Sequence, residues 1–226
     1  MAGDPRGPVL GFGDSITSGP GEGAYSVQPQ PWSQWLAEAM DLPFHRVAQS
    51  GAQTPWMARA LLPRVRDDYA LACVHAGTND VRDVDWDAAA YAAGLEAILA
   101  ALAQRARLLC VATVPLDLGR PRAGAKVGDL NAIIRGRAAV HGATVVSLDD
   151  LRGWRLVLPD AVHPTALGQV EIAERAARAL GLERSPAAIA DASRGPRADV
   201  RYALGRQVAH LVRDGRRRLG ERGSRG

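Results

Sequence analysis

Five short apolar segments recur along the chain, and each is followed by polar or glycine-rich residues. They occupy residues 9–13, 44–48, 69–75, 108–114 and 143–148. Apolar runs of this length, without regular polar alternation, are typical of strands that are buried on both faces of a parallel sheet. The pattern therefore predicts five strands of a parallel sheet.

Between these runs, apolar residues return at the spacing of an amphipathic helix. The helices predicted in this way cover residues 31–40, 55–62, 86–105, 127–140 and 165–180. Strands that alternate with helices indicate βαβ units, whose crossovers are right-handed. The expected fold class is therefore α/β, a three-layer α/β/α sandwich around a parallel sheet of five strands in the flavodoxin-like order 2-1-3-4-5.

The end of the chain differs from the rest in composition and charge. Residues 183–226 hold 11 arginines and five acidic residues, a net charge of +6, so residues 1–182 carry a net charge of −2. We expect residues 1–182 to form the main domain and residues 183–226 to form a linker, up to Ala198, followed by a basic amphipathic helix. That helix either docks on the body with a solvated arginine face or attaches reversibly to an anionic membrane or a partner protein. No aromatic platform or recognition motif accompanies the arginines, so nucleic-acid binding is not expected.

The length and composition of the chain indicate a protein with a full hydrophobic core and no membrane-spanning segment. At 226 residues, 47% of them hydrophobic, the chain can bury a full core, and its formal net charge is +4. It holds no uncharged apolar run long enough to span a membrane, and the polar residues 1–8 lead directly into the first predicted strand, so we expect a cytoplasmic protein.

The two cysteines, Cys73 and Cys110, lie in separate apolar runs, which predicts reduced core residues and no metal site. No glycine-rich phosphate or dinucleotide loop is present, so no cofactor is expected.

Polar positions follow three of the predicted strands, at what becomes one edge of the sheet. Ser15 follows the first strand, Gly51 the second and Asn79 the third, and the loop before the last helix of the body adds Asp160 and His163. Open α/β sheets bind their ligands at the carboxyl ends of the strands. We therefore expect these five residues to meet there.

The same five residues have the chemical roles that ester hydrolysis requires. A serine is a poor nucleophile until a base removes its proton, and histidine is suited to that task near neutral pH. We predict Ser15 as the nucleophile, His163 as general base and then acid, and Asp160 as the group that orients the imidazole. The backbone N–H groups of Ser15 and Gly51 and the side-chain amide of Asn79 are predicted to form an oxyanion hole.

The sequence resembles the SGNH hydrolases, also called GDSL-type esterases or lipases. Four blocks carry the resemblance, in the order of that family: Gly13-Asp14-Ser15, Ser50-Gly51-Ala52, Gly77-Thr78-Asn79-Asp80 and Asp160-Ala161-Val162-His163-Pro164. The first block departs in one conservative detail, because Ile16 stands where the older family name has leucine. The resemblance covers residues 8–180. It implies acyl-ester hydrolysis through an acyl-enzyme, without a metal or a cofactor, at the triad and the oxyanion hole predicted above.

The resemblance leaves the substrate open, because the family includes lipases, carbohydrate deacetylases, lysophospholipases, thioesterases and some acyltransferases. The main hypothesis is a hydrolase of small-molecule acyl esters. An acyltransferase that uses the same acyl-enzyme is the alternative, and a non-catalytic binding module is disfavoured because no catalytic position is lost. Residues 18–31 and 115–126 are predicted to wall the substrate pocket. The sequence does not determine the acyl chain, the leaving group or the oligomeric state.

Several further residues have predicted supporting roles. Asp80 is expected to brace its loop through hydrogen bonds, and Thr54 to cap the helix that follows it. His75 is expected to be a hydrogen-bonded core histidine. Trp86 and Trp154 are placed on loops near the pocket, where packing and contact with an acyl chain are both open.

Overall fold

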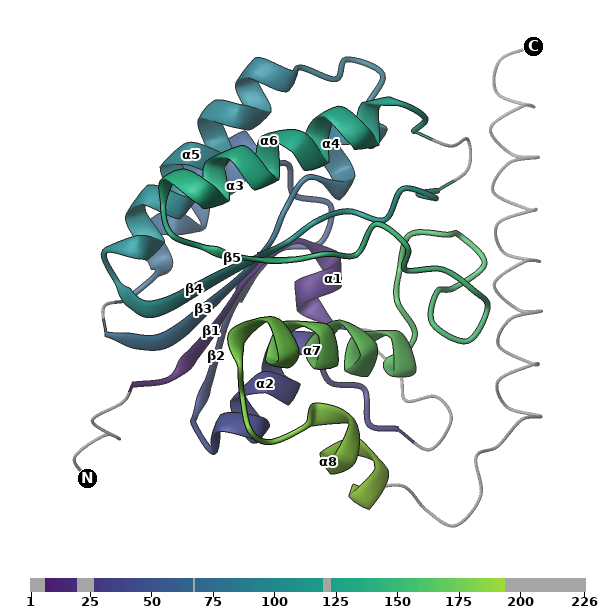
Figure 1. The fold of residues 1–226 in the computed structure, drawn as a ribbon. Coiled ribbons are helices and arrows are strands. Elements are labelled where there is room, and N and C mark those ends of the chain that lie inside the picture. Colours follow the sequence, from purple (N-terminus) through teal and green to yellow (C-terminus); the bar gives the residue numbers. More distant parts are fainter. Residues whose placement is uncertain (1–6, 20–26, 67, 120–122, 194–226) are drawn as a thin grey trace.

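The computed structural model describes residues 7–19, 27–66, 68–119 and 123–193 (Figure 1). At its centre lies a five-stranded sheet in which every neighbouring pair of strands is parallel. The order across the sheet is β2-β1-β3-β4-β5, which confirms the predicted fold class and topology. The strands are β1 (Val9–Gly13), β2 (Phe44–Ala48), β3 (Tyr69–His75), β4 (Ala106–Ala112) and β5 (Thr144–Val146).

Helices cover both faces of the sheet and give the predicted three layers (Figure 1). Helices α1, α2, α7 and α8 lie on one face, and α3, α4, α5 and α6 lie on the other. Their bounds are α1 (Ser15–Ser18), α2 (Trp32–Met40), α3 (Thr54–Ala60), α4 (Thr78–Arg82), α5 (Ala88–Ala103), α6 (Lys126–Val140), α7 (Ala166–Leu180) and α8 (Pro186–Ser193), with a short 3-10 helix at Leu62–Arg64.

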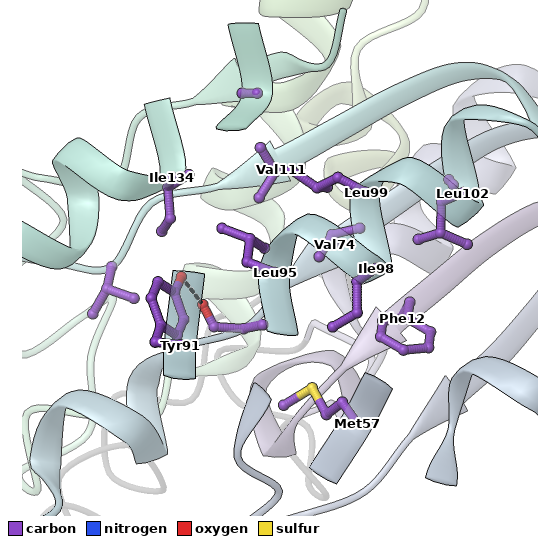
Figure 2. Packing of buried hydrophobic residues seen from close by; sticks show 14 of the residues in the cluster. Phe12, Met57, Val74, Tyr91, Leu95, Ile98, Leu99, Leu102, Val111 and Ile134 are labelled. Carbon is purple, nitrogen blue, oxygen red and sulfur yellow. Dashed lines mark hydrogen bonds between the residues drawn. The ribbon is translucent and has the colours of Figure 1, made fainter. Parts of the chain in front are cut away.

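The two faces of the sheet bury separate apolar clusters. Successive side chains of a strand point to opposite faces, so Val9 packs under α2 and α7, whereas Leu10 and Phe12 pack under α3 and α5. Figure 2 shows the second cluster, in which Phe12 of the sheet lies near side chains of α3 and α5. Cys73 and Cys110 are free and fully buried in the first cluster, as predicted.

Some strands and helices begin at other residues than predicted. Strand β4 begins at Ala106, two residues before the predicted start, because Ala106 already pairs with Tyr69 of β3. The first residues of β4 are less buried than its second half, and Leu108 is 44% exposed. The helix predicted from Trp86 begins two residues later, because Asp87 caps it by accepting hydrogen bonds from the N–H groups of Ala89 and Ala90 at 2.9 and 3.0 Å. An N-terminal cap of this kind fixes the start of a helix, which the apolar spacing alone does not define.

The segment that was predicted as a linker contains a helix. Helix α8 lies within residues 183–198 and packs against α7, with Ala190 only 1% exposed. Glu174 of α7 holds its start, because the Glu174 carboxylate accepts hydrogen bonds from the Ser185 hydroxyl and the Ala187 N–H. The linker prediction is therefore wrong over α8. The predicted basic helix beyond residue 200 lies outside the described residues. Among the helices that are described, none has the length and apolar character needed to cross a membrane.

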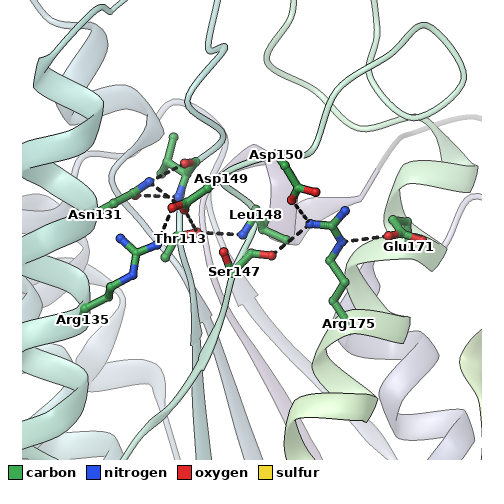
Figure 3. A network of polar contacts seen from close by, with 10 residues as sticks. Thr113, Asn131, Arg135, Ser147, Leu148, Asp149, Asp150, Glu171 and Arg175 are labelled. Carbon is green, nitrogen blue, oxygen red and sulfur yellow. Dashed lines mark hydrogen bonds and ion pairs between the residues drawn. The ribbon is translucent and has the colours of Figure 1, made fainter.

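A polar network joins the ends of β4 and β5 to the helices on both sides (Figure 3). Asn131 of α6 donates to the Val114 carbonyl at 2.7 Å and accepts from the Val114 N–H at 2.9 Å. Across the sheet, Arg175 of α7 donates to the carbonyl of Ser147 and to the carboxylates of Asp150 and Glu171. These contacts anchor the start of the irregular segment that leads from β5 toward His163.

Candidate active site

Ser15 is the first residue of α1, directly after the sharp turn that ends β1. Asp14 precedes it in an extended conformation, and its Oδ1 accepts a hydrogen bond from the Ile16 N–H at 3.0 Å. A Cβ on Gly13 would lie 2.2 Å from the carbonyl oxygen of His75 on β3, so only glycine allows this approach between the strands. The turn thereby places Ser15 at the carboxyl edge of the sheet, beside its central strand.

His163 reaches Ser15 from the other end of the described chain, 148 residues away. Oγ of Ser15 lies 2.9 Å from Nε2 of His163, and Nδ1 of His163 lies 2.7 Å from Oδ2 of Asp160. Oδ1 of Asp160 accepts hydrogen bonds from the N–H groups of Val162 at 2.9 Å and of His163 at 3.0 Å. The three side chains form one continuous chain of hydrogen bonds. In it Nδ1 can donate to the carboxylate while Nε2 accepts from the serine hydroxyl.

A short antiparallel turn holds the segment that carries the histidine. Val157 and Pro164 pair as an isolated bridge, and the Leu158 N–H donates to the His163 carbonyl at 2.8 Å. Thr165 then caps α7, because its hydroxyl oxygen accepts from the Gly168 N–H at 3.1 Å. The imidazole is thus carried on a backbone whose polar groups are paired on both sides of it.

Gln169 of α7 joins the histidine side of the site to the serine side. Its Nε2 donates to the Ile16 carbonyl at 3.0 Å, and its Oε1 accepts from the Trp32 N–H at 2.8 Å. The residue is only 1% exposed. Its role was not predicted from the sequence, because a polar glutamine does not belong to the apolar stripe of α7. The available signal was a glutamine directly beside Val170 in that stripe, since a buried amide needs partners for both its donor and its acceptor.

The carboxyl group of Asp160 has a strongly altered pKa. Burial raises this pKa, but hydrogen bonds from the His163 ring, from the His163 N–H and from the Val162 N–H, together with the imidazole charge, outweigh burial and lower it to about 2. Asp160 is therefore ionised at every pH at which a histidine can serve as a base.

This lowered pKa predicts a loss of stability in acid. A carboxyl whose pKa is lower in the folded than in the unfolded chain stabilises the fold above its ordinary pKa of about 3.9, and this contribution is lost as the pH falls toward 2. We expect Asp160 to contribute about 2 kcal/mol to the free energy of unfolding at pH 7. Urea unfolding of the wild type and of Asp160→Asn at several values between pH 2 and pH 7 measures it. A difference between the two proteins that does not shrink in acid would contradict this assignment.

The loops that carry Gly51 and Asn79 leave the sheet on either side of Ser15. Gly13 at the end of β1 pairs with Ala48 of β2 on one side and with His75 of β3 on the other. The loop after β2 therefore begins beside the serine turn, and α4, which contains Asn79, begins on its other side. The structure thus brings the predicted oxyanion residues to the same edge as the serine.

Gly51 and Asn79 both border open space. Gly51 has a φ of +78°, in the left-handed region, and a Cβ there would meet no atom within 4 Å. The Asn79 side chain donates one hydrogen of its amide to the Ala52 carbonyl at 3.0 Å. Because an amide carries two hydrogens, the second remains available to a ligand.

Asp80 braces the two loops against each other, as predicted. Its carboxylate accepts from the Thr54 N–H at 2.9 and 3.1 Å and from the Thr54 hydroxyl at 3.1 Å. Burial raises the pKa of Asp80 above its ordinary value, and the hydrogen bonds from Thr54 act in the opposite direction. The prediction that Thr54 caps α3 is wrong, because Gln53 takes the cap position and the Thr54 hydroxyl binds Asp80 instead.

The other residues and loops that were considered near the pocket have different positions in the structure. His75 is buried as expected, and its Nδ1 lies 3.4 Å from Oδ1 of Asp14. The predicted hydrogen bond is absent, because neither ring nitrogen has a hydrogen-bond partner among the described residues. Trp86 packs against Tyr91, with ring centroids 5.4 Å apart. Trp154 is 56% exposed and lines a separate hollow of about 550 Å³ beside α7 and α8. The predicted pocket walls lie partly outside the described residues, at 20–26 and 120–122.

Within the described part of the chain, no three histidine, cysteine or acidic side chains gather in a way that could hold a metal ion. The site consists instead of a hydrogen-bonded serine, histidine and aspartate at the carboxyl edge of a parallel five-stranded sheet. This fold and this arrangement define the class of SGNH-type carboxylic ester hydrolases. The chain belongs to the GDSL-like lipase/acylhydrolase family, whose model matches residues 12–170.

Solved structures of hydrolases share the fold. Axe2, an acetylxylan esterase from Geobacillus stearothermophilus, is 18% identical with a TM-score of 0.60 over 80% of this chain and 98% of that one. LAE5, an α/β hydrolase from the metagenome of Lake Arreo, is 20% identical with a TM-score of 0.60 over 79% and 97%. An extracellular lipase from Streptomyces rimosus is 22% identical with a TM-score of 0.54 over 77% and 98%. No curated protein matches the sequence.

Proposed function

We propose that this protein hydrolyses carboxylic esters through an acyl-enzyme formed on Ser15. His163 takes the proton of the Ser15 hydroxyl as Oγ attacks the ester carbonyl, and it then gives that proton to the leaving alcohol oxygen. Asp160 keeps the proton of His163 on Nδ1 and stabilises the imidazolium that forms. In the second half of the reaction, His163 removes a proton from water, the resulting hydroxide attacks the acyl carbonyl, and Ser15 leaves with that proton.

The observation that carries this proposal is the unbroken line from Ser15 Oγ through the imidazole to Asp160. The 2.9 Å and 2.7 Å contacts at the two ring nitrogens are the distances that proton transfer and orientation require. The brace at Asp80 and the contact of Asn79 with Ala52 support an oxyanion hole that is already formed before substrate binds. Membership in an acylhydrolase family is consistent with both points.

A fluorophosphonate probe tests the mechanism directly. We expect one equivalent of probe to attach to the peptide that contains Ser15, and a short ester such as p-nitrophenyl acetate to give an initial burst of one equivalent of nitrophenol. Adding an alcohol acceptor and analysing the products then separates hydrolysis from acyl transfer. Labelling of a different serine, or no labelling of active protein, would contradict the acyl-enzyme on Ser15.

Replacing Asn79 with alanine tests the oxyanion hole. Removal of one pre-aligned donor is expected to lower kcat by about 10²–10³-fold with little change in KM, because the amide binds the developing oxyanion more strongly than the ground-state carbonyl. Steady-state kinetics with p-nitrophenyl acetate measure the effect, and Asn79→Asp, which replaces the donor with an acceptor, serves as the matched variant. A fall of less than tenfold in a well-folded Asn79→Ala protein would remove this residue from the hole.

A further inference from the structure

A hollow of about 530 Å³ lies beside the two predicted oxyanion residues. It is lined by the loop that follows β2 and by the first turn of α3, and Gly51 and Asn79 form part of its wall. Its other side chains include Gln49, Gln53 and Trp56. We call it the Trp56 hollow. Because it shares wall residues with the candidate oxyanion hole, a substrate bound at Ser15 is within reach of it.

The lining of the Trp56 hollow is polar except for one aromatic ring. Trp56 is 40% exposed and is the only large apolar side chain there, while the rest of the wall is amide, hydroxyl, methyl and backbone groups. A long acyl chain would find few apolar partners on such a surface. A ring with hydroxyl groups at its rim and C–H groups on its face fits better, since an indole face attracts polarised C–H groups and amides pair with hydroxyls.

The side-chain amide of Gln53 and the backbone at Gln49 are already held in position. Nε2 of Gln53 donates to Oδ2 of Asp83 at 2.6 Å, which orients the Gln53 amide and leaves its carbonyl oxygen as an acceptor. The Gln49 N–H donates to the Gly13 carbonyl at 3.1 Å, so the start of this loop is tied to the serine turn. Trp56 itself precedes Met57, which is fully buried and fixes that turn of α3 in the core.

We propose that the Trp56 hollow binds the sugar ring of an O-acylated carbohydrate, with Trp56 stacking on the ring and Gln49 and Gln53 pairing with its free hydroxyls. The proposal rests on the ester hydrolysis proposed above and names its substrate class. The sugar is the alcohol part of such an ester, so its oxygen accepts the proton from His163 as the bond to the acyl carbon breaks. The free sugar leaves at this step, and the acyl group stays on Ser15 until water removes it.

The test compares two kinds of acetyl ester that form the same acyl-enzyme. Two monoacetylated methyl glycosides, acetylated at O6 of glucose and at O2 of xylose, are compared with ethyl acetate, whose alkyl group is too small to stack. We expect Trp56→Ala to lower kcat/KM for at least one glycoside by about 10-fold or more, mainly through KM, and to change ethyl acetate hydrolysis by less than about twofold. Trp56→Phe, which keeps an aromatic face, should retain most of the glycoside activity.

Trp154→Ala is the matched control, because it removes the other exposed tryptophan from a different hollow. It should leave both kinds of substrate unchanged. Equal losses on glycosides and ethyl acetate in Trp56→Ala, a loss confined to a long-chain ester such as p-nitrophenyl octanoate, or a wild type that cleaves ethyl acetate but neither glycoside would each overturn the carbohydrate assignment. A wild type that cleaves no ester and takes no fluorophosphonate would instead refute the proposed function itself.

Discussion

Ser15→Ala is expected to lower kcat for p-nitrophenyl acetate by about 10⁶-fold, because removing the nucleophile of a triad costs nearly as much as removing the whole triad. The fold should survive the change. Among the described residues, the Ser15 hydroxyl makes one side-chain hydrogen bond, with Nε2 of His163. The turn around it is held by the Asp14 cap and by the close packing of Gly13 on β3. Steady-state kinetics and thermal unfolding of both proteins measure the two effects.

Ser18→Ala provides the matched control for this experiment. Ser18 ends the same short helix, and its hydroxyl donates to the Asp14 carbonyl at 3.2 Å without contacting the imidazole. Its removal should change kcat by only a few-fold. If Ser15→Ala kept more than a hundredth of the wild-type kcat while its unfolding was normal, Ser15 would not be the nucleophile.

Asp160→Asn is the second large effect, an expected fall of about 10⁴-fold in kcat. An asparagine can still accept the N–H groups of Val162 and His163 through its oxygen, so the backbone turn is preserved. Its NH₂ group, however, would face Nδ1 of His163 as a donor. The imidazole would then carry its proton on Nε2 and could no longer accept the proton of the Ser15 hydroxyl.

Activity measured from pH 5 to pH 9 tests this explanation. The loss in Asp160→Asn should persist across the range, because a wrong tautomer is not corrected by deprotonation. Asp150→Asn makes the same change of charge at a side chain that is 77% exposed and paired with Arg175, and it should remain near wild-type activity. Recovery of Asp160→Asn at high pH would show that the carboxylate acts only by its charge.

Much of the fold was predictable because burial leaves a periodic signal in the sequence. The bounds of β1, β2 and β3 were predicted to the residue. Strands β1 and β3 are buried along their whole length and tolerate few polar side chains, whereas β2 is an edge strand whose Arg46 is exposed. Helix α8 was missed because alanine-rich residues after a proline resemble a linker locally. Only its contact with Glu174 and α7 shows that the segment is packed.

In the candidate site, too, some residues could be predicted from the sequence and others could not. Ser15, Asp160 and His163 stood out because each lies in a short motif whose residue types have defined chemical roles. Gln169 left only a weak signal, its place beside the apolar stripe of α7. Neither its partners nor the choice of Thr54 as the partner of Asp80 could be predicted, because these partners lie far away in the chain. The Trp56 hollow could not be predicted from the sequence either, because a single exposed tryptophan in a helix forms no repeating pattern.

The sequence by itself determined the layer architecture and the residue types that carry the chemistry, because these follow from local periodicity and from short motifs. The predicted strand order came from the class of fold that this alternation indicates. The tertiary structure alone decided that an imidazole 148 residues away lies 2.9 Å from the serine hydroxyl, and that an indole and two amides surround a hollow beside it. The physical reason is that distances between remote residues are set by the packing of α7 and α3 on the sheet, which no local pattern of residues encodes.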